Sequence, residues 1–174
     1  MGSPSEPLCT SLICLIPKGG DKIVLKNWRP ITLLGTAYKI LAKTLAFHLR
    51  PLLPYIIRAT QIGFVHDRST MFFPFREATH SAPESLQDIT LLLLDFENAY
   101  DTVDWRFLMG IMGRLGFNDY WISWVSPLNS DSANRMVLCG GKGPTFQLSR
   151  SVRQGCPLAT YLFLFVVEAM GYFL

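Results

Sequence analysis

The stretch LLLLDFENAYDTVDW, residues 91–105, runs four consecutive leucines into a segment with four acidic residues. A uniformly apolar run is typical of a central strand covered on both faces, so residues 89–95 are predicted to form one. An acid at the carboxyl end of such a strand emerges at the rim of the sheet, where open sheets place ligand chemistry. Asp95 is therefore the strongest single candidate, and its hard oxygen ligands suit Mg²⁺.

The acids that follow Asp95 are weaker candidates for ligand binding. Glu97 could join a ligand set, Asp101 is interpreted as a local turn acid, and Asp104 is predicted to cap a helix that Gly116 closes. For an isolated aspartate at a strand end, hydrogen bonds to nearby amides are the commoner role. The assignment of Asp95 therefore depends on other motifs in the chain.

The composition describes one globular piece without linkers or repeats. Its 174 residues are 49% hydrophobic and 17% charged, which is enough apolar side chain for one core. Four cysteines form neither a C-x-x-C pair nor a framework, which favours buried thiols over disulfides or a zinc site. The N-terminus lacks a basic n-region, and the longest apolar stretch, residues 161–174, is too short to span a bilayer. We expect an intracellular protein, nuclear or cytoplasmic, with no signal peptide and no membrane contact.

The net charge of +3 conceals a segregation along the chain. Residues 17–76 contain ten Lys and Arg against two acids, a balance of +8, whereas residues 77–131 contain nine acids against two bases, a balance of −7. This pattern suggests a polyanion-binding surface beside a cation-binding one. On charge alone, two ordinary solvated faces explain it equally well.

Periodicity predicts the elements of the first half. Residues 11–16 and 31–34 are predicted strands, and Pro30 argues against a helix before the second. Residues 36–50 are a predicted helix ended by Pro51 and Pro54. Its cations Lys39, Lys43 and Arg50 fall within an arc of roughly 40° at 3.6 residues per turn.

The second half is predicted to be helical around one hairpin. Residues 104–115 and 120–128 are predicted helices, the second strained near its end by Pro127. Residues 135–148 have the pattern of a β-hairpin. A final helix begins near Pro157, which we place at its first position.

Four motifs together resemble reverse transcriptases of the LINE type, the non-LTR retrotransposons. DFENAYDTVDW resembles the first palm motif, in which an aromatic follows the Asp by five residues, and RSVRQGCPLATYLF resembles the next motif. NWRPITLLGTAYKILAKTLA and QIGFVHDRST resemble the two preceding finger blocks, in the expected order. The motifs cover nearly all of residues 12–170 and favour the LINE branch over group II intron maturases.

The resemblance implies an α+β fold, the fingers and partial palm of a right-hand polymerase, with an antiparallel palm sheet backed by helices. Residues 1–88 would be a fingers-like basic region, and residues 89–174 a partial palm, incomplete at its C-terminus. Arg29 is expected to project toward the same cleft as Asp95 and Tyr100.

The resemblance also implies residue roles in the palm. Asp95 matches the aspartate that coordinates both catalytic metals, Mg²⁺ or Mn²⁺, in the complete enzyme. Phe96 supplies its backbone beside that site, and Tyr100 matches the aromatic under the incoming sugar that excludes a ribose 2′-hydroxyl. Gln154 and Gly155 match the motif that contacts the incoming dNTP and the template, with glycine permitting close approach.

In the fingers, Arg29 and Lys18 match residues that grip the triphosphate. The block expected to line the template path comprises Gln61, Gly63, Phe64 and Arg68. The cations Lys39, Lys43 and Arg50 are expected to contact nucleic-acid backbone. The implied partners are an RNA template, a DNA primer and dNTP.

The chain also departs from the family. Asp67 stands where the second finger block usually has glycine, and Thr160 replaces a usual proline. No adjacent Asp-Asp pair occurs, although the family places one after the RQGCPL helix. We interpret the chain as a fragment of an RNA-directed DNA polymerase that needs the missing C-terminal part of the polymerase. We expect that it does not hold the metals productively or polymerise alone.

Two alternatives remain. The first is a catalytically dead nucleic-acid-binding remnant, which would keep the basic surface without the chemistry. The second is an unrelated enzyme or structural domain, which the absence of a Walker loop and of an H-E-x-x-H motif makes weak.

Overall fold

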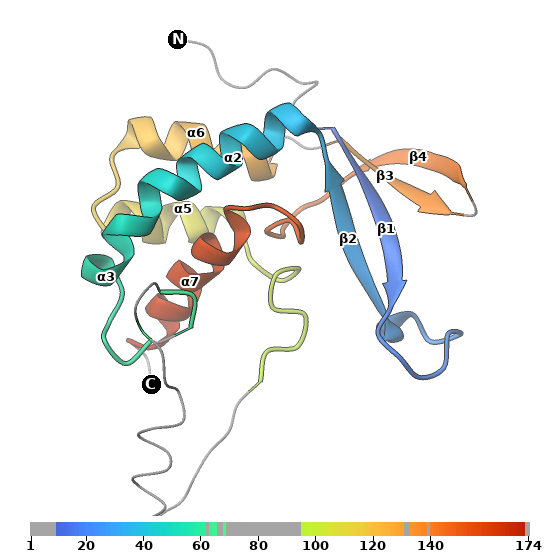
Figure 1. The fold of residues 1–174 in the computed structure, drawn as a ribbon, viewed down its shortest axis with the longest axis horizontal. Helices are drawn as coiled ribbons and strands as arrows, with labels where there is room; N and C mark the ends of the chain where they lie inside the picture. Colours follow the sequence, from blue (N-terminus) through green and yellow to red (C-terminus); the bar gives the residue numbers. More distant parts are fainter. Residues whose placement is uncertain are drawn as a thin grey trace, which may run out of the picture.

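The computed structural model describes residues 10–61, 63–65, 68, 95–130, 133–138 and 140–172. A four-stranded sheet lies beside a group of helices (Figure 1), so the fold is α+β as expected. The predicted strand 89–95 lies outside the described residues apart from Asp95, which belongs to no helix or strand.

The sheet is mixed. Its strands are β1 (Ser11–Pro17), β2 (Trp28–Leu34), β3 (Ala133–Leu138) and β4 (Gly141–Gln147), in the order β2-β1-β3-β4. The two hairpins pair antiparallel internally, and β1 pairs parallel with β3. This sheet is therefore not the antiparallel palm sheet that we expected, because it draws two strands from each side of residue 88. The division of the chain at residue 88 stays a prediction.

Of the three prolines in the described strands, Pro30 and Pro144 lie on edge strands, and Pro17 ends β1 beyond the residues that pair with β3. Pro30 is in β2 and Pro144 is in β4, the two ends of the sheet order. An edge strand needs no N–H on its free side, so it tolerates proline where a central strand would not. The β3–β4 register also shifts between Arg135 and Val137, next to Pro144.

The predicted helices are confirmed with small differences at their ends. The helical segments are α2 (Thr36–Leu49), η2 (Arg50–Leu52), α3 (Leu53–Ile56), α5 (Trp105–Arg114), α6 (Asp119–Ser130) and α7 (Ala159–Met170), besides the short turn η1 (Leu25–Asn27). Pro54 does not end the helical path as expected, because it occupies the first turn of α3, where its missing N–H has no helical partner to lose. Pro157 is not the first helical residue, since α7 begins at Ala159. Pro127 lies inside α6.

The core lies among the helices, and Leu34 of β2 joins it from the sheet. Tyr38, Leu49, Leu108 and Phe165 are fully buried there, and they come from α2, α5 and α7. The predicted cap is confirmed, because the Asp104 side chain accepts a hydrogen bond of 2.9 Å from Phe107 N at the start of α5. This packing determines where α5 and α7 lie.

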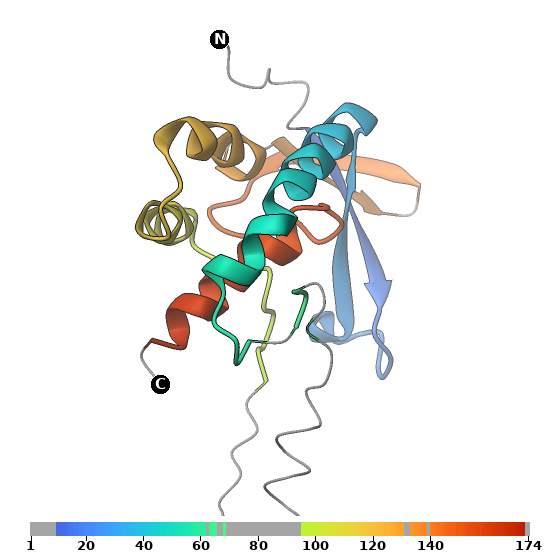
Figure 2. The same ribbon diagram turned by 60° about the vertical axis from the view of Figure 1, so that its left-hand side comes forward.

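The segment 95–104 leads up to the start of α5. Figures 1 and 2 both show it, in yellow-green, between α7 and the β1–β2 hairpin. The two motifs on which the sequence interpretation depends therefore lie next to the hairpin that carries Lys18 and Arg29.

Candidate functional site

The two predicted palm motifs are joined by two backbone hydrogen bonds and one from a tryptophan side chain. Three hydrogen bonds run from Val152 N to Tyr100 O (2.8 Å), from Ser151 N to Val103 O (2.9 Å) and from Trp105 Nε1 to Ser151 O (2.6 Å). Ser151 has a φ of 130°, a strained value that these bonds hold in place. The segment that contains Tyr100 is thus positioned by the one that contains Gln154.

The second motif also lies against the edge of the sheet. Thr32 N in β2 donates to Gln154 O over 2.9 Å. Gly155 has a φ of +106°, and a Cβ atom there would lie 2.8 Å from Thr32 O. The close approach at Gly155 is made to β2, and the predicted approach of this glycine to the nucleotide and the template stays a prediction.

Asp101, in the first palm motif, lies near residues of the second palm motif and of the β1–β2 hairpin. Gln154 Nε2 donates to its two carboxylate oxygens over 3.3 and 3.1 Å. Burial raises the pKa of Asp101, while the Gln154 hydrogen bond and the nearby Lys18 ammonium partly oppose that rise. The structure therefore brings the predicted residues Lys18 and Gln154 together around an acid that we had assigned to a turn. The position of Asp101, six residues after Asp95, did not distinguish the two roles.

Phe163 of α7 contacts both aromatic residues of the first motif. Its ring centroid lies 5.1 Å from that of Tyr100 and 5.4 Å from that of Phe96. Such tilted and edge-on pairs contribute about 0.5–1.5 kcal/mol beyond burial. Tyr100 is half-buried, so one part of its ring packs on α7 while the rest stays accessible.

An exposed ion pair joins the same two regions. Lys26 Nζ, in the β1–β2 connection, lies 3.6 Å from Glu97 Oε1, and both side chains are more than three-quarters exposed. An exposed pair contributes little stability. Its importance is positional, because it lies between the basic and acidic parts of the chain. Part of the charge segregation seen in the sequence is therefore internal pairing.

Asp95 is exposed, and its Oδ1 accepts a hydrogen bond of 2.8 Å from Phe96 N. Among the residues that the structure describes, no three His, Cys, Asp or Glu side chains are grouped so that they could hold a metal ion. One carboxylate suits Mg²⁺ chemically but is too few for a two-metal centre. Arg29 is exposed on β2 opposite Ile16, and its orientation toward Asp95 stays a prediction.

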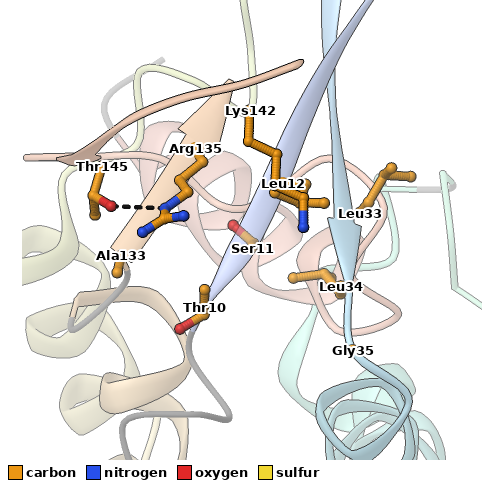
Figure 3. A pocket seen from close by; sticks show the side chains of 10 residues that line it. All are labelled: Thr10, Ser11, Leu12, Leu33, Leu34, Gly35, Ala133, Arg135, Lys142 and Thr145. Carbon is orange, nitrogen blue, oxygen red and sulfur yellow. Dashed lines mark hydrogen bonds between the residues drawn. The ribbon is translucent and has the colours of Figure 1, made fainter. Parts of the chain in front are cut away.

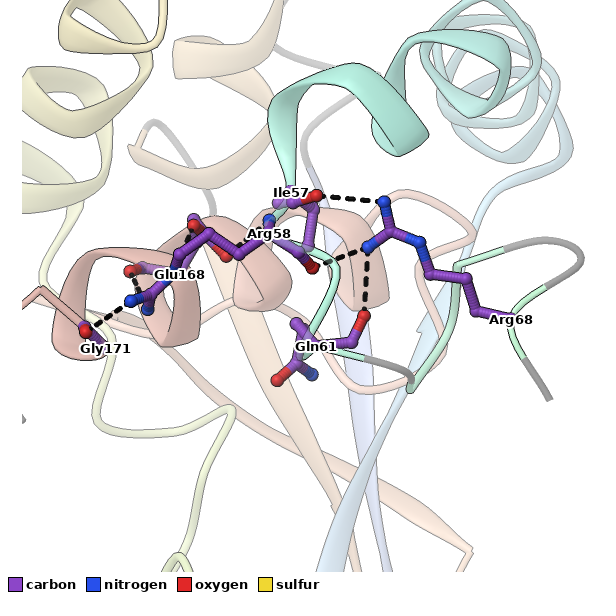
Figure 4. A network of polar contacts seen from close by, with 6 residues as sticks. All are labelled: Ile57, Arg58, Gln61, Arg68, Glu168 and Gly171. Atoms are coloured by element: carbon purple, nitrogen blue, oxygen red, sulfur yellow. Dashed lines mark hydrogen bonds and ion pairs between the residues drawn. The ribbon is translucent and has the colours of Figure 1, made fainter. Parts of the chain in front are cut away.

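The predicted template block folds as a turn after α3, and Arg68 holds it together (Figure 4). The Arg68 guanidinium donates to four backbone carbonyls, those of Pro54 (2.8 Å), Ile57 (3.0 Å), Arg58 (2.6 Å) and Gln61 (3.1 Å). Phe64 is 65% exposed and has a φ of 64°. In this arrangement Arg68 shapes the turn, while Phe64 is presented on its surface beside Gly63.

Arg58 attaches this turn to α7. Its Nε donates to Glu168 Oε1 over 2.8 Å, its N to Glu168 Oε2 over 3.2 Å, and its Nη1 to Gly171 O over 2.5 Å. Glu168 is buried, at 1% exposure, and a Cβ at residue 171 would overlap the guanidinium. Sequence reasoning missed this pair. The sequence signal that could have indicated it is Glu168, an acid inside the otherwise apolar stretch 161–174.

The remaining predicted cations form a separate surface. Lys39, Lys43 and Arg50 are all exposed along α2 and its C-terminal end, and they belong to a different element from Asp101, Lys18 and Gln154.

Across the described ranges, no helix has the length and apolar character needed to cross a membrane.

Comparisons with known proteins identify the chain. Residues 16–172 match the family described as reverse transcriptase (RNA-dependent DNA polymerase). The chain is 32% identical over 161 residues to an uncharacterized 149 kDa protein of the transposon TX1 of Xenopus laevis, covering 91% of this chain and 12% of that protein. It is 28% identical over 172 residues to the retrovirus-related Pol polyprotein of the type-1 retrotransposable element R2 of Popillia japonica, covering 97% of this chain and 24% of that protein.

The chain belongs to the reverse transcriptase family. Its relatives come from retrotransposons, which confirms the LINE-type resemblance seen in the sequence motifs. It spans less than a quarter of the length of either relative. Members of this family use divalent metal ions and bind an RNA template and a primer in general.

Proposed function

We propose that this chain forms the deoxynucleotide-binding and template-facing part of an RNA-directed DNA polymerase of a LINE-type retrotransposon. The parent reaction is nucleotidyl transfer from a dNTP to a primer 3′-hydroxyl. The observation that carries the proposal is the junction of β2 and both palm motifs at Gln154, whose carbonyl accepts from Thr32 N of β2 and whose side-chain amide donates to Asp101 of the first motif.

Different residues would bind different parts of the nucleotide. The cations Lys18 and Arg29 suit the triphosphate, because an ammonium and a planar guanidinium both pair with phosphate oxygens. Tyr100 would lie under the sugar, where its ring leaves no room for a 2′-hydroxyl. Packing on Phe163 supports this role, since a gate must be rigid to discriminate.

Gln154 would contact the incoming nucleotide with the oxygen of its amide. Its Nε2 is held by the Asp101 carboxylate, which leaves the amide in one orientation. Its backbone is fixed on β2 by the Thr32 bond. Asp101 is in this proposal a positioning residue, and Asp95 is the carboxylate assigned to a metal.

Nucleotide binding by the purified chain tests the proposal. With a primed RNA template and Mg²⁺, we expect dNTP to bind more tightly than the matching rNTP. Arg29→Gln should weaken both by about tenfold, the loss of one charge-assisted contact. Tyr100→Ala should bring the rNTP affinity close to that of the dNTP. The control Arg106→Gln removes an exposed arginine on α5 and should change neither affinity.

The alternative, a nucleic-acid-binding remnant, predicts a different pattern. The template would bind, dNTP would not, and Tyr100→Ala would have no effect on selectivity. Triphosphate binding that Arg29→Gln leaves unchanged would also contradict the proposed role of the hairpin.

A further inference from the structure

A pocket of about 500 Å³ lies at the end of the sheet where β1 begins and β2 ends (Figure 3). It is lined by Thr10, Ser11, Leu12, Leu33, Leu34, Gly35, Ala133, Arg135, Lys142 and Thr145. In the β1–β2 register, Ser11 pairs with Leu34 at this end and Pro17 with Trp28 at the other. The pocket is therefore at the opposite end of the hairpin from Lys18 and Arg29.

Two cations line this pocket. Figure 3 shows the side chains of Arg135 and Lys142 extending into it from β3 and β4. Arg135 Nε donates to Thr145 Oγ1 over 2.8 Å, which restrains the guanidinium. None of the described residues that line the pocket is acidic. The electrostatics at this end of the sheet therefore favour an anion.

The pocket also has an apolar floor. Leu12 is half-buried on β1, and Leu33 is 48% exposed on the paired position of β2. Apolar surface beside two cations matches a ligand that has both a phosphate and a flat or sugar-like body. A volume near 500 Å³ is in the range of ordinary ligand pockets.

The residues next to the pocket favour a nucleic-acid strand over a free nucleotide as its ligand. Gly35, at the pocket edge, is the N-cap of α2, and Lys39 lies four residues further on, about 6 Å along the helix axis. Lys43 and Arg50 follow on the same helix, and all three cations are exposed. A row of cations that continues from a cationic pocket complements several successive phosphates.

We propose that this pocket binds one phosphodiester of a single-stranded nucleic acid, outside the proposed nucleotide site. The phosphate lies between Arg135 and Lys142, the sugar or base packs on Leu12 and Leu33, and the strand continues along α2. The contact holds the strand at the far end of the hairpin from the dNTP.

Fluorescence anisotropy with labelled single-stranded RNA and DNA tests this proposal on the full chain. The double variant Arg135→Gln, Lys142→Gln should lower single-strand affinity by about tenfold at low salt, because two phosphate contacts are lost. Its salt slope should fall by about 1.4, at about 0.7 per contact on a single strand. The matched control Arg106→Gln, Arg114→Gln removes the same charge from exposed positions on α5 and should leave both values near those of the unmodified chain.

A charge-neutral variant separates a built pocket from a general positive field. Thr145→Val removes the partner of Arg135 and keeps every charge, so the proposal predicts about threefold weaker single-strand binding. Equal losses in the double variant and its control would overturn the proposal. A loss of affinity confined to blunt duplex would also overturn it, as would a mononucleotide that binds as tightly as the single strand. RNA and DNA that respond alike would support recognition of the phosphate, and a response in RNA alone would overturn it.

Discussion

At residue 155 the chain has room for a hydrogen atom and not for a methyl group. The φ of +106° and the 2.8 Å approach to Thr32 O each favour glycine independently. A similar restriction occurs at Gly171, where the Arg58 guanidinium fills the space of a side chain. Both glycines lie at contacts between segments far apart in the chain, and at Gly155 the contacting atom belongs to the backbone.

Gly155→Ala should destabilise the protein by about 2–3 kcal/mol, because the new methyl group meets a backbone carbonyl in a left-handed conformation. Gly110→Ala is the control, since Gly110 is exposed within α5 with nothing close to its Cβ position. The control should be neutral or stabilising by up to about 1 kcal/mol. Urea denaturation measures both, and equal effects would contradict the close approach.

Asp101 predicts a pH dependence of stability. Burial raises its pKa above the ordinary value of 3.8, so the folded protein holds this proton more tightly than the unfolded chain does. The contribution of this group to stability is therefore greatest at low pH and is lost as the pH rises from 3.8 through the raised pKa.

Asp101→Asn should remove this loss, because asparagine keeps an acceptor for Gln154 and does not titrate. We expect the unfolding free energy of the variant to increase relative to that of the unmodified chain as the pH rises above 3.8, and this difference to level off once the pH has passed the raised pKa of Asp101. Urea titrations across this range, with exposed Asp119→Asn as the control, measure the difference. A difference that stays constant with pH would show that burial does not perturb Asp101.

At the scale of elements, helix ends and sheet edges follow local rules. Side chains cap two helices, since Asp104 accepts from Phe107 N at α5 and Asn118 accepts from Trp121 N at 2.8 Å before α6. The prolines at 30 and 144 lie on edge strands. α7 is more dependent on its neighbours, because its buried Glu168 is paired with an arginine beyond α3.

Asp104→Ala should cost about 1 kcal/mol of stability, because the α5 cap is lost. Asp104→Ser keeps a capping oxygen and should recover most of that loss. Thermal or urea unfolding of the two variants gives the comparison. If alanine and serine were equivalent here, the capping bond would contribute nothing.

At the scale of the whole molecule, opposite charges from the two halves meet along one boundary. Lys26 pairs with Glu97, and Lys18 lies near Asp101. The cations of α2 and of the pocket have no such acidic partners among the interactions described above, so they dominate the field elsewhere. This distribution predicts a sequence-tolerant affinity for nucleic acid that depends strongly on salt.

Lys39→Gln with Lys43→Gln should lower the salt slope of primer-template binding by about 1.8, at about 0.9 per contact on duplex. The double variant Arg106→Gln, Arg114→Gln on α5 again supplies a matched charge control. Filter binding or anisotropy over a salt series gives the slopes. Binding that ignored salt, or identical slopes in both variants, would leave the α2 cations as an ordinary solvated face.

Local sequence determined much of this protein. The strands at residues 11 and 31, the α2 and α5 helices, the Asp104 cap and the hairpin follow from short-range periodicity, capping and turn preferences, which act within a few residues. The family followed from four short motifs in order. These features depend little on distant contacts, so one sequence suffices to predict them.

Other features were decided only by tertiary structure. The parallel pairing of β1 with β3 joins strands that begin more than a hundred residues apart, a distance that local sequence patterns do not span. The role of Asp101, the use of Arg68 on carbonyls and the buried Arg58–Glu168 pair arise the same way. A polar side chain can serve a turn, a partner or a ligand equally well until the fold supplies its neighbours, because burial and partner geometry set its free energy.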